Sequence, residues 1–201
     1  MTKIKICGLR RMEDVVWANA LLPDYVGFVF APSKRQVTPE AARAMIEKLD
    51  PKIITVGVFV NAGAEELLKT KETCGLDILQ LHGEETPEFC AGLSTPVWKG
   101  FRVRSELTFA IANGYEVQGY LLDGYDASAH GGTGKTFDWR KAGDFKFNAP
   151  LIAAGGIDEN NVREVIEILS PMAVDVSSAV ETDGYKDPDK VARLIGKVRN
   201  G

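Results

Sequence analysis

The fold is decided by the stretch Lys3-Ile4-Lys5-Ile6-Cys7-Gly8-Leu9. It reads as a first β-strand, because residue types alternate along it and a glycine stands at its exit. Successive side chains of a strand point to opposite faces, so Lys3, Lys5 and Cys7 share one face. If the strand is central and parallel, both of its faces are covered, and a face that carries lysines and a cysteine must line something enclosed and polar. The interior and mouth of a β/α barrel meet that need, provided that the chain supplies eight such strands.

Outward from this stretch, strand-like and helix-like segments alternate along the whole chain. Apolar runs of strand length are followed by segments of helical spacing, and Thr38 before Pro39 is typical of a helix start. The predicted strands are 3–7, 24–30, 53–60, 77–82, 96–101, 118–123, 149–154 and 172–176. The predicted helices are 11–21, 39–49, 64–74, 87–93, 105–113 (capped by Ser105), a short one near 138–142, 160–169 and 187–199. This alternation predicts an α/β fold, a single (β/α)₈ TIM barrel domain with a parallel eight-stranded barrel over residues 1–201. The rival, a doubly wound open sheet, usually needs fewer strands and a glycine turn at its switch point.

Composition narrows the class of protein. Hydrophobic residues make up 45% and charged residues 26%, and the net charge of −4 does not favour a nucleic-acid or membrane-surface role. Neither an apolar run of about 20 residues nor a signal-peptide pattern is present. The three cysteines lack metal-ligand spacing, and Cys74 and Cys90 fall in predicted helices as packing residues. We therefore expect a cytoplasmic protein with free thiols, a monomer with a homodimer as the alternative, and a small molecule rather than a nucleic acid or membrane as its partner.

Polar residues gather where active sites of β/α barrels lie, at the carboxyl ends of the predicted strands. They are Cys7 on the first strand, Gln80 and His82 on the fourth, Asp123 on the sixth and Asp175 on the eighth. The first and last strands of a closed barrel are neighbours, so an inward Lys5 is expected to pair with an inward Asp175, which removes the cost of an unpaired buried charge.

Each of these residues also has a purely structural interpretation. A strand cysteine such as Cys7 is usually a small buried hydrophobe, and Asp123 could brace the loop that follows it. His82 is interpreted as a structural hydrogen-bonding residue rather than a base. Lys5 and Asp175 could form no more than an internal ion pair.

Two loops late in the chain carry the features of an anion site. Ala154-Gly155-Gly156-Ile157 and Asp175-Val176-Ser177-Ser178-Ala179-Val180-Glu181 follow the seventh and eighth predicted strands. Barrels commonly bind a substrate phosphate in these two loops, through backbone amides. Glycine lets the backbone approach the anion, and serine adds hydroxyl donors. A phosphate site at Gly155, Gly156, Ser177 and Ser178 is therefore predicted.

A glycine-rich segment earlier in the chain resembles a nucleotide-binding loop. Ala129-His130-Gly131-Gly132-Thr133-Gly134-Lys135-Thr136 satisfies a relaxed phosphate-loop pattern, with alanine at the first glycine. A true phosphate loop leads straight into a long helix, whereas the helical segment here is short. We interpret residues 129–136 as a lid over the barrel mouth.

Taken together, the motifs resemble those of the phosphoribosylanthranilate isomerase family of tryptophan biosynthesis, in the right order and over the whole chain. The matching segments are Lys5-Ile6-Cys7-Gly8, Gly27-Phe28-Val29-Phe30, Ser33-Lys34-Arg35, Gly57-Val58-Phe59-Val60-Asn61, Gln80-Leu81-His82-Gly83, Leu121-Leu122-Asp123, Gly131-Gly132-Thr133-Gly134-Lys135-Thr136-Phe137-Asp138-Trp139, Ala154-Gly155-Gly156-Ile157 and Val174-Asp175-Val176-Ser177-Ser178. The resemblance implies a (β/α)₈ barrel without metal or organic cofactor. It also implies an aldose–ketose isomerase that converts N-(5-phosphoribosyl)anthranilate to the open-chain carboxyphenylamino-deoxyribulose phosphate by an Amadori rearrangement.

The resemblance assigns roles to residues of this chain. It makes Asp123 the general acid and Cys7 the general base, so that one group must hold a proton while the other has lost it. A thiol needs a lowered pKa for that task, and Lys5 is interpreted as a stabiliser of the thiolate. Arg35 would hold the anthranilate carboxylate with its planar fork. The predicted substrate-binding residues are Arg35, Asp175, Gly155, Gly156, Ser177 and Ser178.

Two rival functions stay open on the sequence. The nearer is another phosphate-binding barrel enzyme, such as the synthase that follows in the same pathway or a sugar-phosphate isomerase. The other is a barrel that binds a ligand without catalysis, in which Cys7 only packs.

Overall fold

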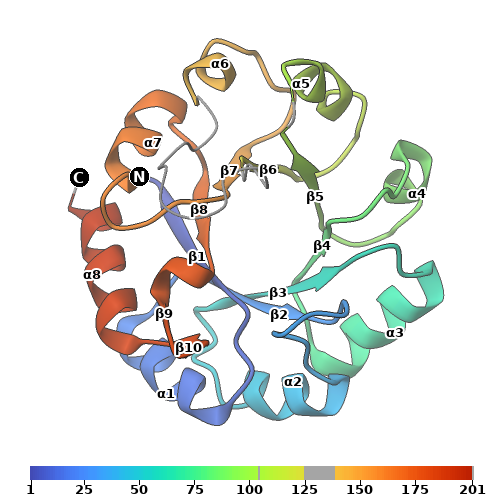
Figure 1. The fold of residues 1–201 in the computed structure, drawn as a ribbon. Helices are drawn as coiled ribbons and strands as arrows, with labels where there is room; N and C mark the ends of the chain where they lie inside the picture. Colours follow the sequence, from blue (N-terminus) through green and yellow to red (C-terminus); the bar gives the residue numbers. More distant parts are fainter. Residues whose placement is uncertain (104, 125–138, 201) are drawn as a thin grey trace.

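The computed structural model describes residues 1–103, 105–124 and 139–200. Parallel strands in chain order close into one barrel, in which β1 pairs with both β2 and β8, and helices surround it (Figure 1). The strands are β1 (Lys3–Cys7), β2 (Tyr25–Val29), β3 (Ile54–Phe59), β4 (Ile78–Leu81), β5 (Val97–Arg102), β6 (Gly119–Asp123), β7 (Leu151–Ala154) and β8 (Ala173–Val176). The helices are α1 (Met12–Leu21), α2 (Pro39–Ile46), α3 (Ala64–Cys74), α4 (Pro87–Ala91), α5 (Leu107–Ala112), α6 (Arg140–Gly143), α7 (Val162–Leu169) and α8 (Pro188–Arg199). The predicted (β/α)₈ barrel is confirmed.

Local sequence signals explain where several helices begin. The Thr38 hydroxyl accepts a hydrogen bond from the Ala41 amide, and Pro39 occupies the first turn of α2. Asp187 caps α8 in the same way, through the amides of Asp189 and Lys190. These side chains satisfy amides that the first turn of a helix leaves without partners.

The barrel interior is filled below its mouth. Tyr25, Val56, Trp98, Leu121 and Ile152 form a buried cluster inside the barrel, and the rings of Tyr25 and Trp98 meet edge to face at 5.0 Å. A second, larger apolar cluster lies between the strands and the helices. The polar residues at the carboxyl ends of the strands therefore lie next to a closely packed apolar cluster.

Element boundaries differ from the sequence predictions by a few residues at most ends. Ser105 was expected to cap the fifth helix, but α5 begins at Leu107 with Glu106 at its N-cap. The sequence analysis also missed a 3₁₀ turn, η1 (Ser178–Val180), and a hairpin of β9 (Glu181–Thr182) with β10 (Tyr185–Lys186). The predicted lid at 129–136 lies outside the described residues.

None of the helices in the described ranges is long and apolar enough to cross a membrane.

Candidate active site

A cavity of about 690 Å³ opens at the carboxyl ends of the strands. It is lined by all of the predicted catalytic and substrate-binding residues, namely Cys7, Arg35, Asp123, Gly155, Gly156, Asp175, Ser177 and Ser178. These residues come from the two ends of the chain and from its middle, and barrel closure brings them together. The residues predicted to form the site therefore line one continuous cavity.

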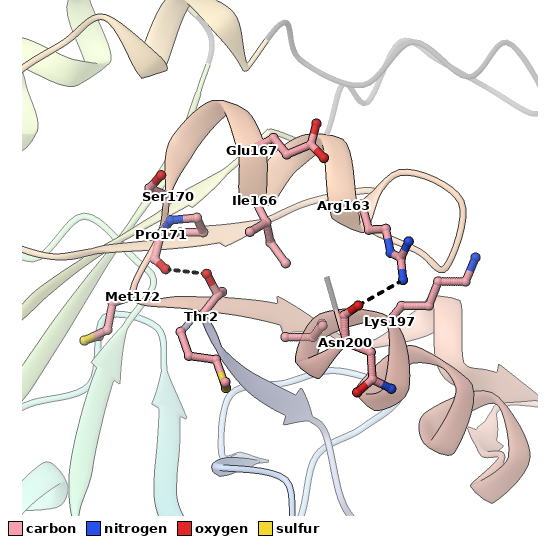
Figure 2. A pocket seen from close by; sticks show the side chains of 11 residues that line it. Thr2, Arg163, Ile166, Glu167, Ser170, Pro171, Met172, Lys197 and Asn200 are labelled. Carbon is pink, nitrogen blue, oxygen red and sulfur yellow. Dashed lines mark hydrogen bonds between the residues drawn. The ribbon is translucent and has the colours of Figure 1, made fainter.

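A second cavity, of about 630 Å³, lies near the start of β1 and β8 (Figure 2). Thr2, Arg163, Glu167, Lys197 and Asn200 are among its lining residues. The Thr2 hydroxyl donates to the Pro171 carbonyl, and Arg163 donates to the Asn200 carbonyl at 3.5 Å. None of the predicted site residues lines this cavity, so it is not the candidate active site.

Cys7 ends β1 in a buried, charged environment. Gly27 faces it from β2, where a Cβ atom would lie 2.8 Å from the Cys7 sulfur, so glycine makes room for the thiol. Lys5 is fully buried, and its ammonium lies 2.9 Å from Asp175 Oδ1 across the β1–β8 seam. Burial disfavours the charged form of Lys5, but Asp175 and the Cys7 thiol outweigh it, and the pKa of Lys5 is raised. The predicted ion pair of Lys5 and Asp175 is confirmed.

The pKa of Cys7 does not follow the expectation of a lowered value. Burial raises the pKa of the thiol, and the opposing effect of Lys5 does not fully offset it. Asp175 adds to the rise, whereas Lys186 opposes it. The lowered pKa that the sequence suggested is wrong for the free protein, because the closed barrel removes water from Cys7 more effectively than its cationic neighbours compensate.

Asp123 ends β6 and lines the same cavity as Cys7. His82 Nε2 lies 3.6 Å from Asp123 Oδ2, and His82 Nδ1 lies 3.1 Å from the Gln80 amide nitrogen. The Gln80 amide can donate to Nδ1, which leaves a proton on Nε2 facing the carboxyl. Arg102 of β5 is paired with Asp123 in the strand register and lines the same cavity. His82 thus contacts the predicted acid and fits its interpretation as a hydrogen-bonding residue.

Arg35 reaches the cavity over Gly8. A Cβ atom at Gly8 would lie 2.6 Å from Arg35 Cδ, and the φ angle of 91° also favours glycine there. The guanidinium is held by Glu181, with Nε 2.6 Å from Oε1 and Nη2 2.9 Å from Oε2. Burial opposes ionisation of Glu181, but hydrogen bonds from Arg35 and Lys186 outweigh it and lower the pKa of Glu181 to about 2. Arg35 therefore enters the site already oriented by a carboxylate.

The two predicted phosphate loops lie side by side at the cavity. Gly155 and Gly156 have φ angles of 88° and 67°, a conformation that glycine adopts readily, and the Asn161 amide donates to the Gly156 carbonyl at 2.8 Å. Ser178 is exposed to the cavity, whereas the Ser177 hydroxyl donates to the Cys7 carbonyl at 2.9 Å. The Ser177 hydroxyl thus ties β8 to β1.

Sequence reasoning missed Glu181 and Lys186 as site residues, as well as Arg102. A signal for the first two exists. Asp183-Gly184 stands between two short extended segments, and both residues have positive φ (51° and 78°), as a two-residue hairpin turn requires. Recognising this turn would have placed Glu181 opposite Lys186.

Fold and site together define the class of protein: a (β/α)₈ barrel of the enzyme type, in which a thiol, a carboxyl, the glycine-bearing loop after β7 and the serine-bearing loop after β8 face one cavity at the carboxyl ends of the strands. Within the described ranges, no group of three or more His, Cys, Asp or Glu residues is placed to hold a metal ion.

Comparison with known proteins gives the family. Residues 4–197 match the family model of N-(5'-phosphoribosyl)anthranilate (PRA) isomerase. A protein of that name from Thermoanaerobacter sp. (strain X514) is 50% identical over 200 residues, which span 99% of this chain and 98% of that relative. The chain therefore belongs to the PRA isomerase family.

Solved structures agree with this assignment. The phosphoribosyl anthranilate isomerase of Thermotoga maritima is similar with a TM-score of 0.90 and 37% identity, over 100% of both chains. A second isomerase structure, which holds reduced 1-(o-carboxyphenylamino)-1-deoxyribulose 5-phosphate, is similar with a TM-score of 0.86 and 36% identity, again over 100% of both chains.

Proposed function

We propose that the protein isomerises N-(5-phosphoribosyl)anthranilate to 1-(2-carboxyphenylamino)-1-deoxyribulose 5-phosphate in tryptophan biosynthesis, with Asp123 as general acid and Cys7 as general base. The single observation that carries this proposal is that both side chains line one cavity, beside the loops that follow β7 and β8. Family membership supports the reaction, and the geometry supports the two roles.

The first two steps of the reaction need an acid at the ring oxygen and a base at C2, the two ring atoms bonded to C1. Asp123 gives its proton to the furanose ring oxygen, the bond between C1 and that oxygen breaks, and the nitrogen lone pair forms a C1=N Schiff base. The Cys7 thiolate then takes the proton from C2, and the released electron pair forms the C1=C2 bond while the nitrogen becomes neutral. The resulting enolamine tautomerises to the ketone when C1 gains a proton and the C2 hydroxyl loses one. No electron leaves the substrate, so the chemistry is a pure rearrangement driven by acid and base.

Groups that can bind the substrate line the same cavity as Cys7 and Asp123. In the proposal, the substrate phosphate lies at Gly155, Gly156 and Ser178, where backbone amides and a hydroxyl can face it. Arg35 receives the anthranilate carboxylate through guanidinium N–H groups that Glu181 leaves unused. Asp175 lines the cavity and accepts a hydrogen bond from Lys5, and its carboxylate can also accept one from a substrate hydroxyl.

A fluorescence assay of the purified protein tests the proposed function. The anthranilate group makes the decay of the substrate visible, and we expect turnover without added metal or cofactor. The rival barrel enzymes predict turnover of indole-forming or simple sugar-phosphate substrates instead. A binding barrel without catalysis predicts none at all, together with an unreactive thiol at Cys7.

Arg35→Ala should raise the Michaelis constant. Loss of a charge-assisted contact to a carboxylate is worth about 1.5–3 kcal/mol, or roughly 10- to 150-fold in affinity. Steady-state kinetics on the variant measure this effect, with Arg43→Ala as the control because Arg43 pairs with Glu47 on the exposed face of α2. A Michaelis constant and turnover equal to those of the parent protein would rule out the role of Arg35.

Inorganic phosphate should compete with substrate and raise the melting temperature, because a ligand that binds only the native state stabilises it. Gly156→Asp places a carboxylate where the anion is proposed to bind, and it should abolish this protection. Asp and Asn both tolerate positive φ, so Gly156→Asn matches its backbone strain without the charge. Protection by phosphate that persists in folded Gly156→Asp would contradict the proposed phosphate site.

The cytoplasmic location, the monomeric state and the single domain over residues 1–201 stay predictions of the sequence.

A further inference from the structure

We propose that Glu181 and Lys186, at the two ends of the β9–β10 hairpin, are positioning residues of the isomerase site: Lys186 fixes Ser177 and, through it, Cys7, while Glu181 orients Arg35. The inference rests on the proposed function of Cys7 and Arg35. It assigns a role in the reaction to a hairpin that itself provides no residue lining the cavity.

Lys186 is a buried cation with a complete set of acceptors. Its side chain is 1% exposed, and its ammonium lies 3.0 Å from the Ser177 carbonyl oxygen, 3.2 Å from Ser177 Oγ and 2.8 Å from Glu181 Oε1. Ser177 Oγ in turn donates to the Cys7 carbonyl at 2.9 Å. An ammonium group has three N–H donors, and these three contacts use all of them. They fix the position of the Lys186 ammonium relative to Ser177 and Glu181. The chain of contacts links the hairpin to the backbone of the proposed base.

Glu181 connects the same hairpin to the other proposed binding group. Its carboxylate accepts two parallel hydrogen bonds from Arg35 and a third from Lys186. A bidentate pair fixes the plane of the guanidinium as well as its position. Since Glu181 is 7% exposed and Arg35 is 19% exposed, this pair has little freedom to rotate. Arg35 is therefore oriented before a substrate carboxylate arrives.

The hairpin is anchored on its outer side. The guanidinium groups of Arg10 and Arg11 each lie 4.4 Å from the centre of the Tyr185 ring. Arg10 also donates to the carbonyls of Gly184 and Lys34, and Arg11 donates to the Lys186 carbonyl. These contacts tie the hairpin to the loops after β1 and β2. Lys186 and Glu181 are thus held from both sides.

The charged side chains near Cys7, Lys186 included, carry a net positive charge, which favours the thiolate form of Cys7. Lys5 on β1 and Asp175 on β8 form one neutral pair beside the thiol, and β2 presents the uncharged Gly27. Lys186 and Arg35 are two cations that share the single carboxylate of Glu181, which leaves one excess positive charge near Cys7. The charge of Lys186 lowers the pKa of Cys7, against the burial that raises it. Removing Lys186 should therefore leave Ser177 and the Cys7 backbone less firmly held, and it should also raise the pKa of Cys7 further.

Steady-state kinetics from about pH 6 to 10, a range centred on ordinary thiol ionisation, test the inference on Lys186→Met, Lys186→Arg and Glu181→Gln. Lys186→Met should lower kcat by about 10- to 100-fold, the loss expected for a misplaced reacting group, and should move the limb of kcat/KM that reports ionisation of Cys7 to higher pH. Lys186→Arg keeps the charge and should return that limb toward the parental position. Glu181→Gln should mainly raise KM, about tenfold, because Arg35 loses its ionic partner while the base keeps Lys186.

Lys197→Met is the matched control, since it removes one lysine charge at the opposite cavity (Figure 2). Circular dichroism and melting temperature establish that each variant is folded. If Lys186→Met does not fold, the KM effect of Glu181→Gln decides. The inference is overturned if the folded hairpin variants match Lys197→Met in kcat, KM and pH limb. Absence of turnover in the parent protein would instead overturn the proposed function.

Discussion

Cys7→Ser is expected to fold like the parent protein and to lose turnover by about 10²–10⁴-fold, the usual worth of a general base. The change is nearly isosteric, and the space that Gly27 provides for the Cys7 side chain also accommodates serine. A serine hydroxyl is far less acidic than a thiol and cannot supply a ready base at the same position. The loss should appear in both kcat and kcat/KM, because the proton of C2 is taken only on the way to the transition state.

Cys74→Ser is the control for this experiment. Cys74 is buried at the end of α3, with its sulfur 3.2 Å from the Pro39 carbonyl, and it lies outside the cavity. The control should keep parental turnover. Iodoacetamide should inactivate the parent protein, and phosphate or a product analogue should protect it. Near-parental turnover of Cys7→Ser would remove the base assignment and make His82 the next candidate.

Asp123→Asn should lose turnover by a similar factor, about 10²–10⁴-fold, with the Michaelis constant little changed. The amide keeps the shape of the side chain but has no proton to give to the ring oxygen. The side chain of Asp123 is 26% exposed at the cavity, so the substitution buries no new group. The phosphate and carboxylate contacts of the substrate lie elsewhere in the proposed site, which is why binding should persist.

Asp144→Asn, on the exposed end of α6, controls for the loss of one negative charge. It should turn over substrate like the parent protein. If Asp123→Asn turned over at a parental rate, ring opening would have to draw its proton from another group or from water. A large rise in KM at parental kcat would make Asp123 a binding residue instead.

The barrel and the convergence of the predicted residues on one cavity were predictable because strand alternation and strand pairing act over short, regular distances. Lys5 and Asp175 are 170 residues apart, yet their pairing follows once the first and last strands are neighbours and both side chains face inward. Cys7, Asp123 and the loops after β7 and β8 were placed by the same rule, since carboxyl ends of parallel strands meet at one face.

The contacts of the loops were not predictable in this way. Arg35 and Glu181 are 146 residues apart and belong to no shared ladder, so no periodicity relates them. The β9 and β10 strands have two residues each, too few for alternation to be visible. Only the Asp183-Gly184 turn marks them, and it carries no information on which side chain turns inward.

The sign of the Cys7 pKa shift was missed for a related reason. From the sequence, Lys5 two residues away on the same face indicates a stabilised thiolate. The balance depends on how completely the closed barrel excludes water from the thiol and on the added charges of Asp175 and Lys186. Those quantities exist only in the folded protein, where burial is the largest of them.

The central claim is that the thiolate of Cys7 removes the substrate proton. Its most direct test compares two pH profiles on the parent protein: kcat/KM from the fluorescence assay, and the rate at which iodoacetamide alkylates Cys7, followed by mass spectrometry of the peptide that contains it. Because burial raises the pKa of Cys7, the alkylation rate should rise with pH and inflect above the ordinary thiol value of about 8.5, and kcat/KM, which also needs Asp123 protonated, should inflect at the same pH. A kcat/KM that stays level, or that inflects at a different pH, while alkylation of Cys7 rises would contradict the account.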